Sequence, residues 1–412
     1  MNATFSTLPF SVNGRRYRPP AKPVVAICMD GCEDDYLNVA IGGGRMPNLA
    51  RMAAGGYRGL VRAALPTYTN VNNACIVSGV PPSVTGISGN FFLDPGSGAE
   101  VMMNSARYLR CDTILAAAAR SGRKVAMVTA KEKLRDLLTR GLQGIAFSSE
   151  RAGEQIQGLP GLEGLAETVR EGSPDIYSAE ASLFVLRAGV ALLESRQSDF
   201  LYLSLTDYVQ HRHAPSAPEA LDFYQAIDHQ LGRLLELGAS VGATADHGMN
   251  AKTRADGQPN VIYLESELRE QFGGSVTVIC PITDPYVVHH GALGSAVTIH
   301  LAEGVSEEDV VQWLSRRQGV TEVCRRPEAT TRLELPPDRI GDLMVFSDRD
   351  VVMGRTPEYH DLSPLRGDLR SHGGRYEESV PLLLSEPCPG AEAAEDPRNF
   401  DLFAYLCEGG FR

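Results

Sequence analysis

An aspartate and a histidine, Asp246 and His247, stand side by side where a short apolar run of the chain ends. Such a run is typical of a buried strand, and open α/β sheets bind ligands at the carboxyl ends of their strands. A carboxylate beside an imidazole at that position could hold a divalent metal ion. The pair could also be ordinary turn chemistry, because most matches to short motifs are accidental. Other strands that end in the same residue types would favour the metal.

Two further apolar runs end in this way. Asp30 and Asp207 each follow such a run, and His211 lies four residues beyond Asp207. His372 lies in a late loop of the chain. Because the ends of parallel strands converge on one edge of a sheet, these side chains together predict a two-metal site.

Zinc fits these oxygen and nitrogen donors best, although manganese or iron could occupy the same positions. We expect two Zn²⁺ per subunit, because two metal ions a few Å apart can hold the attacking and the leaving oxygens of an in-line displacement. A threonine hydroxyl beside a metal, from Thr67 or Thr69, could then act as the nucleophile. The expected ligands form two sets, with Asp30, Asp246 and His247 on one metal and Asp207, His211 and His372 on the other.

Two lysines, Lys131 and Lys133, follow another apolar run, so their loop should lie at the same edge of the sheet as the metals. Their charges could bind a second anionic group on a phosphorus compound and stabilise negative charge that develops on the leaving group. Lysines after a strand are more often solvated, so a surface role stays open.

Composition narrows the class of protein. The 412 residues are 43% hydrophobic and 22% charged, which is ordinary for a globular protein. A formal net charge of −12 argues against a broad nucleic-acid interface. The eight scattered cysteines suggest reduced thiols. No signal peptide and no run of about 18 apolar residues is evident, so we expect a cytoplasmic protein without a membrane partner.

Strands alternating with helices predict an α/β fold with a mostly parallel central sheet and helices on both faces. Residues 150–176 should be irregular. The regular alternation of strands and helices ends at 256–337, where shorter β runs surround one helix. We expect a smaller inserted α+β cap domain there. The run 339–346 should then return the chain to the central sheet. The catalytic core would comprise 1–255 and 338–412.

The order of these motifs resembles the alkaline phosphatase superfamily, most closely its nucleotide pyrophosphatase/phosphodiesterase branch. The resemblance covers about residues 22–255 and 338–388. It implies that Thr69, the second threonine of a Pro-Thr-x-Thr segment, is the nucleophile and a metal ligand. It also implies that Asn72 helps to hold a phosphoryl oxygen. The motifs are Asp30, Pro66-Thr-Tyr-Thr-Asn-Val-Asn-Asn73, Asp207-x-x-x-His211, Asp246-His247-Gly248 and His372-Gly373-Gly374.

Within the superfamily, the sequence is most similar to members that cleave phosphonoacetate, on residues 207–215 and 129–133. This implies a di-zinc hydrolase that breaks the carbon–phosphorus bond, giving acetate and phosphate through a phosphothreonine intermediate, with the two lysines on the substrate's carboxylate. Asn90, in a Gly-rich loop, and His213, two residues after His211, could also contact this small phosphonate substrate. The paired His289 and His290 are expected to be surface or core histidines.

Other functions stay open. A nucleotide phosphodiesterase or pyrophosphatase would need a slot for a base, to which Tyr68 and Phe91 could contribute. The segment 70–73 departs from the Phe-Pro-Asn-His of that branch. A non-catalytic phosphonate-binding protein and a metal-dependent phosphomutase are further alternatives. The oligomeric state is open, and a homodimer is one option.

Overall fold

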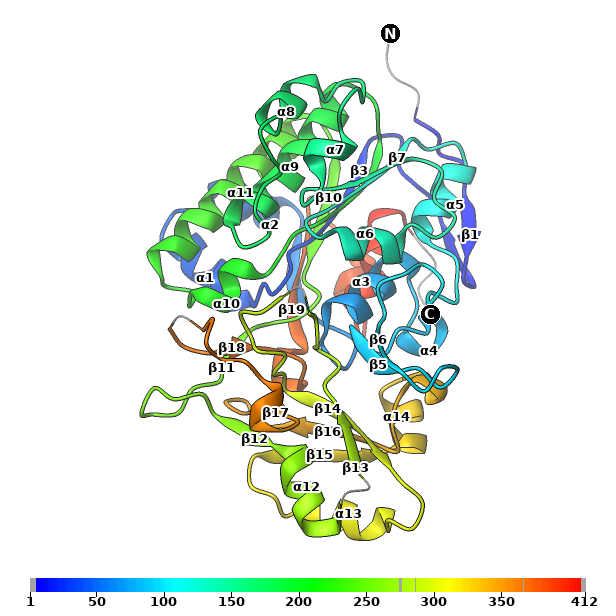
Figure 1. The fold of residues 1–412 in the computed structure, drawn as a ribbon. Helices are drawn as coiled ribbons and strands as arrows, with labels where there is room; N and C mark the ends of the chain where they lie inside the picture. Colours follow the sequence, from blue (N-terminus) through cyan, green and yellow to red (C-terminus); the bar gives the residue numbers. More distant parts are fainter. Residues whose placement is uncertain (1–4, 274–275, 286, 366, 409–412) are drawn as a thin grey trace.

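A seven-stranded sheet forms the centre of the computed structural model, which describes residues 5–273, 276–285, 287–365 and 367–408 (Figure 1). Its strands are β3 (Val24–Cys28), β4 (Tyr57–Arg62), β7 (Val125–Thr129), β8 (Ile145–Ser148), β9 (Phe200–Ser204), β10 (Ser240–Thr244) and β19 (Ser379–Leu384). They lie in the order β4-β19-β10-β3-β9-β7-β8. Every pair from β10 to β8 is parallel, whereas β19 runs antiparallel to both neighbours. The expected mostly parallel sheet is thus confirmed.

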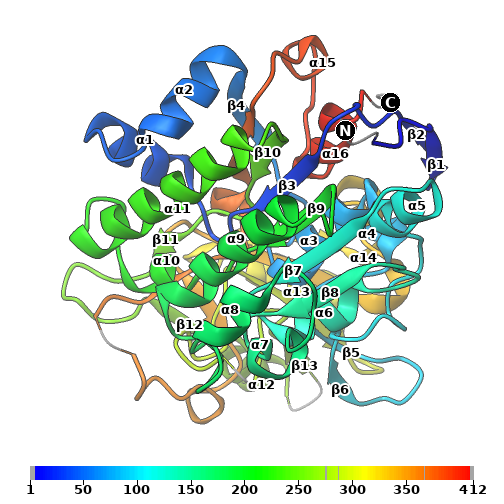
Figure 2. The same cartoon turned by 90° about the horizontal axis from the view of Figure 1, so that it is seen from above.

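Helices cover both faces of this sheet (Figure 2). On one face, α9 (Ala179–Glu194) packs on β7 and β9, and α11 (Pro218–Glu236) packs on β10. On the other face, α5 (Ile114–Arg120) packs on β7 and β9, and α16 (Leu402–Leu406) packs on β3 and β10. The inner strands are buried along their whole length, which explains their continuous apolar runs. Among the described residues, none of the helices is both long and apolar enough to span a membrane.

Local sequence signals set where several helices begin. The hydroxyl of Thr113 accepts a hydrogen bond from the backbone N–H of Ala116, and this caps α5. Prolines occupy the first turns of α2 (Pro47–Gly55) and α11, where their missing N–H costs nothing.

A smaller four-stranded antiparallel sheet lies at the bottom of Figure 1, with α12 (Leu264–Phe272) and α13 (Glu307–Leu314) beside it. In order across the sheet its strands are β13 (Val276–Ile279), β14 (Ala296–Leu301), β16 (Leu343–Ser347) and β15 (Val320–Arg325). We expected 339–346 in the central sheet, and this is wrong, because β16 pairs with β14 and β15. An apolar run predicts burial but not the partner strand. The bounds of the cap domain, 256–337, stay a prediction. The smaller sheet takes strands from both sides of residue 337.

Shorter elements make up the rest of the described chain. They include α1 (Asp34–Gly42), α3 (Thr69–Ser78), α4 (Pro82–Thr85), α6 (Glu132–Leu138), α10 (Tyr208–Arg212), α14 (Arg326–Arg332) and α15 (Pro389–Glu392). Strand pairs are β1 (Phe10–Val12) with β2 (Arg15–Tyr17), β5 (Phe91–Leu93) with β6 (Glu100–Met102), β11 (Asn250–Ala251) with β18 (Arg370–Ser371), and β12 (Val261–Tyr263) with β17 (Val352–Gly354). The segment 150–176 is not wholly irregular, since it contains α7 (Ala152–Gln155) and α8 (Glu163–Thr168).

Candidate active site

Three aspartates meet at the carboxyl ends of adjacent parallel strands. Asp30 follows β3, Asp207 follows β9 and Asp246 follows β10, and these strands are neighbours in the sheet. Their exposed fractions are 1%, 3% and 0%. Buried carboxylates require a compensating positive charge, so this edge of the sheet is suited to cations.

Asp30, Asp246 and His247 form the first expected ligand set, and one ligand atom from each lies within 4.8 Å of the others. Nε2 of His247 lies 3.1 Å from Oδ1 of Asp30 and 3.8 Å from Oδ2 of Asp246. Neither carboxylate oxygen of Asp30 has a hydrogen bond within the described residues. Burial, followed by the charge of Asp30, raises the pKa of Asp246 well above its usual value. Two buried carboxylates beside one imidazole, one of them without a hydrogen bond among the described residues, fit a metal ion.

Asp207 organises the second expected set. Nε2 of His211 lies 2.9 Å from Oδ2 of Asp207, and Nε2 of His372 lies 3.8 Å from the same oxygen. Asp207 immediately precedes α10, so His211 follows one helical turn later on the same face. Although burial opposes it, the charges of Lys131 and His211 hold the pKa of Asp207 well below its usual value.

The three histidines share one arrangement. In each ring, Nδ1 lies close to a backbone carbonyl oxygen, at 2.7 Å in His211, 2.8 Å in His372 and 2.9 Å in His247. A ring that donates from Nδ1 to a carbonyl keeps its Nε2 lone pair for a metal, and such partners orient metal-binding histidines. The donor set therefore fits bound metal, and His372 is grouped with Asp207 and His247 as well as lying near His211.

Thr69 begins α3 beside the first set. Its Oγ1 lies 3.5 Å from Nε2 of His247, and the residue is 8% exposed. The hydroxyl of Thr67 instead donates to the backbone oxygen of Gly374 and accepts from the N–H of Gly373. Of the two threonines, the structure thus brings Thr69 to the metal ligands.

Glycines allow this close packing at two positions. Gly31 has φ +69°, and a Cβ there would lie 3.0 Å from Cβ of Asp207. Gly373 has φ +118°, and a Cβ there would lie 2.4 Å from the hydroxyl of Tyr68. Both turns, Asp30-Gly31 and His372-Gly373, therefore need glycine to present their ligand.

The two lysines point into a pocket beside these ligands. Nζ of Lys131 lies 3.2 Å from Oδ1 of Asp207, and Nζ of Lys133 contacts a carboxylate oxygen of Asp284. Burial and the charge of Lys131 lower the pKa of Lys133 to about 7. The pocket is narrow, with a cavity volume of about 20 Å³. Its lining includes Thr69, Asn70, Asn90, Lys131, Lys133, Asp207, His211, Asp284, His290 and His372.

Two residues expected at the substrate lie elsewhere. Asn72 accepts a hydrogen bond from the N–H of Ala64 at 2.7 Å and donates to its carbonyl at 3.0 Å, so it braces the chain before α3. The neighbouring Asn73 faces the site instead and donates to Oδ2 of Asp246 at 3.1 Å. His213 is half-buried, and its Nδ1 lies 3.6 Å from a carboxylate oxygen of Glu219, outside the pocket lining.

Asn90 does line the pocket, where its Oδ1 accepts a hydrogen bond from the N–H of Asn70 at 3.0 Å. The structure thereby places the Gly-rich loop next to the start of α3, near Thr69. This contact makes Asn70 a further pocket residue that sequence reasoning missed.

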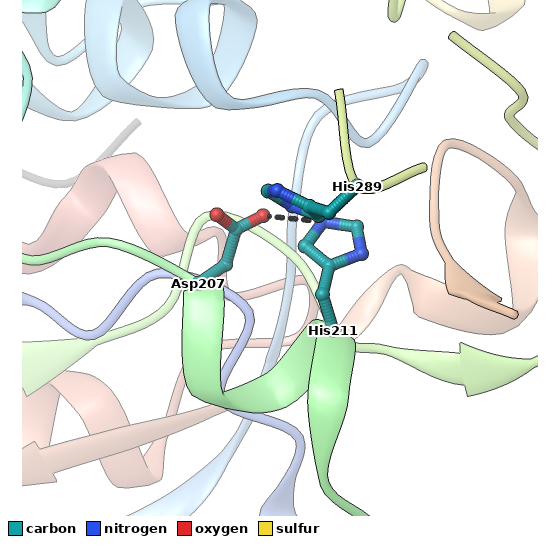
Figure 3. A group of neighbouring side chains, drawn as sticks. All are labelled: Asp207, His211 and His289. Carbon is teal, nitrogen blue, oxygen red and sulfur yellow. Dashed lines mark ion pairs between the residues drawn. The ribbon is translucent and has the colours of Figure 1, made fainter. Parts of the chain in front are cut away.

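The segment between β13 and β14 brings more residues that the sequence did not reveal, namely Asp284, His289 and His290. One ring nitrogen of His289 lies within 4.8 Å of ligand atoms of Asp207 and His211. Figure 3 shows Asp207 at the start of α10 and His211 within it, while His289 reaches them from a separate segment. The only signal in the sequence is the His-His pair itself, and nothing in it indicates proximity to Asp207.

Solved structures share this fold. A mutant of the alkaline phosphatase PafA matches with a TM-score of 0.66 at 16% identity, over 95% of this chain and 96% of that chain. Murine ectonucleotide pyrophosphatase/phosphodiesterase 5, in complex with AMP, matches with a TM-score of 0.64 at 16% identity, over 94% of both chains. These two matches show that the chain shares the fold of those enzymes, and its strand ends carry groups of residues that could hold metal ions.

Closer relationships define the family. The model of the type I phosphodiesterase/nucleotide pyrophosphatase family matches residues 24–375. Phosphonoacetate hydrolase from Sinorhizobium meliloti, in complex with phosphonoacetate, is 45% identical over 98% of this chain and 99% of that chain, with a TM-score of 0.92. Its complex with phosphonoformate gives the same values. The chain belongs to the type I phosphodiesterase/nucleotide pyrophosphatase family.

Proposed function

We propose that this protein is a zinc-dependent hydrolase that cleaves phosphonoacetate to acetate and phosphate. The observation that carries the proposal is that Lys131 and Lys133 line the same pocket as Thr69 and the second expected ligand set, Asp207, His211 and His372. A phosphonate bound at the metals and a carboxylate bound at the lysines would account for the two groups of positive charge in the site. The 45% identity to the S. meliloti phosphonoacetate hydrolase supports this substrate.

Two zinc ions would occupy the site. Asp30, Asp246 and His247, with Thr69, would hold one, and Asp207, His211 and His372 would hold the other. When bound, the two ions would neutralise phosphonate oxygens and lower the pKa of a coordinated hydroxyl or water. Two observations support this assignment: the oxygens of Asp30 accept no hydrogen bond among the described residues, and Oδ2 of Asp207 lies near both His211 and His372.

Thr69 would supply the nucleophile. Its Oγ1 would attack phosphorus and form a phosphothreonine, while the electron pair of the broken carbon–phosphorus bond stays on the acetate carbon. The hydroxyl proton of Thr69 would be lost to solvent and the acetate carbon would take one proton from solvent, so that the two steps balance. Water would then cleave the phosphothreonine to release phosphate and restore the hydroxyl. The start of α3 favours negative charge on Oγ1, because the positive end of a helix dipole lies there.

The two lysines would bind the carboxylate and stabilise the charge that delocalises into it as the carbon departs. Lys131 is held against Asp207 at 3.2 Å, and Lys133 is held by Asp284. This fixes both ammonium groups in a buried pocket before the substrate arrives, so little reorganisation is needed.

Hydrolysis of nucleotide diesters is the second candidate, because the family model carries that activity in its description. It requires a slot for a base. Tyr68 is fully buried and its hydroxyl donates to the carbonyl of Ala296 at 2.8 Å, so it offers no such slot. Phe91 is absent from the described lining of the pocket.

A phosphate-release assay with the zinc-loaded protein tests the proposal. We expect phosphonoacetate to be cleaved with a higher kcat/KM than a nucleotide diester or an aryl phosphate monoester. A preference for the diester would transfer the assignment to the second candidate. Binding without turnover on all three would indicate a phosphonate-binding protein, and an isomerised product without free phosphate would indicate a phosphomutase.

A further inference from the structure

His289 stands out among the histidines near the site because it comes from the side of the smaller sheet. It lies between β13 and β14, far in sequence from the other ligand candidates, yet one of its ring nitrogens lies within 4.8 Å of ligand atoms of both Asp207 and His211 (Figure 3). Its ring centroid lies 4.3 Å from that of His211. The smaller sheet therefore delivers an imidazole directly to the second ligand set.

The ring nitrogens of His289 are also unsatisfied. Both are buried, and neither has a hydrogen-bond partner within the described ranges. Neighbouring histidines differ. Nδ1 of His290 accepts from the N–H of Ala292 at 3.0 Å, and Nε2 of His360 accepts from the N–H of Arg355 at 2.8 Å. Leaving a buried polar atom unpaired costs about 1–3 kcal/mol, so His289 is adapted to a partner that these side chains do not provide.

Aromatic neighbours hold the ring of His289 in this position. Tyr177 and Tyr208 pack edge-on against it, with centroid distances of 5.9 and 6.1 Å. Tyr208 belongs to α10, the helix that also carries His211. The orientation of His289 is thus set by the same element that presents the ligands.

We propose that His289 is a further ligand of the metal ion held by Asp207 and His211. This rests on the metal assignment of the proposed function, in which His372 completes the protein ligands and a fourth position stays open. His289 takes that position in the substrate-free protein. Metal binding then ties the segment 287–293 to α10.

Cobalt titration tests this ligation without measuring turnover. Co²⁺ replaces zinc and reports its ligands by absorption. We expect His289→Leu to bind one of its two Co²⁺ ions at least about tenfold more weakly than the unmodified protein, since even groups that only orient ligands contribute 10- to 100-fold. The matched control His213→Leu, whose imidazole lies outside the pocket, should bind both ions normally.

A second variant separates ligation from packing. His289→Cys offers a thiolate, and we expect a new thiolate-to-cobalt absorption band in the near ultraviolet that His213→Cys lacks. Unchanged cobalt affinity in His289→Leu would overturn the proposal. Weakened affinity in both His289 variants without a thiolate band would also overturn it, because the ring would then act only by packing. A thiolate band in a protein that does not cleave phosphonoacetate would refute the proposed substrate and leave the ligation intact.

Discussion

Replacing Lys133 by methionine should impair phosphonoacetate cleavage selectively. The side chain of Lys133 is 15% exposed, so its charge acts in a partly dehydrated pocket. Two unit charges about 4 Å apart interact by about 4 kcal/mol at an effective dielectric constant of about 20. Asp284 offsets part of this attraction, because the substrate's carboxylate must share the ammonium group of Lys133 with the carboxylate of Asp284. We therefore expect a loss of about 2–3 kcal/mol, or roughly 30- to 150-fold in kcat/KM.

The assay compares phosphate release from phosphonoacetate and from an aryl phosphate monoester, which lacks the carboxylate. The variant should hydrolyse the ester within about threefold of the normal rate. Lys124→Met serves as the control, since Lys124 donates to the backbone oxygen of Arg196 away from the pocket. Equal losses on both substrates would refute the carboxylate role and indicate that Lys133 supports the metal site instead.

Three other perturbations test the same site. Thr69→Ala should retain its zinc, measured by elemental analysis, but lose roughly 10³-fold or more of its turnover, and near-normal activity would rule out Thr69 as the nucleophile. Chelation should lower Tm by several °C, because a metal at 100 times its Kd stabilises by about 2.7 kcal/mol and Asp30 otherwise accepts no hydrogen bond among the described residues. A Tm unaffected by chelator and by added zinc would argue against metal at these residues. Burial and Lys131 lower the pKa of Lys133 to about 7, so its ammonium form is lost as pH rises through that value. We therefore expect kcat/KM for phosphonoacetate to fall above pH about 7 relative to kcat/KM for the aryl ester. Parallel pH profiles for the two substrates would contradict this role.

The central ligands could be predicted from sequence because their signal is local. Asp30, Asp207 and Asp246 each lie within a few residues of a buried strand, and parallel strands bring such positions together. His211 follows Asp207 by one helical turn, which the spacing also reveals. These short-range rules suffice to assemble most of the candidate site.

What escaped prediction depends on tertiary packing. Asn72 and Asn73 differ by one step of about 100° around α3, and only the helix's placement decides that Asn73 faces Asp246. The run that became β16 is apolar enough for either sheet, and its partners settle the choice. His289 comes from the segment between β13 and β14, and only the tertiary arrangement brings it to Asp207.

The most direct test of the proposed function is a ³¹P NMR time course of the zinc-loaded protein with phosphonoacetate, with acetate measured in the same sample. We predict that the phosphonate signal is replaced by that of inorganic phosphate, with one acetate formed for each phosphate. A phosphonate signal that persists while the same preparation cleaves a nucleotide diester would contradict the proposed function.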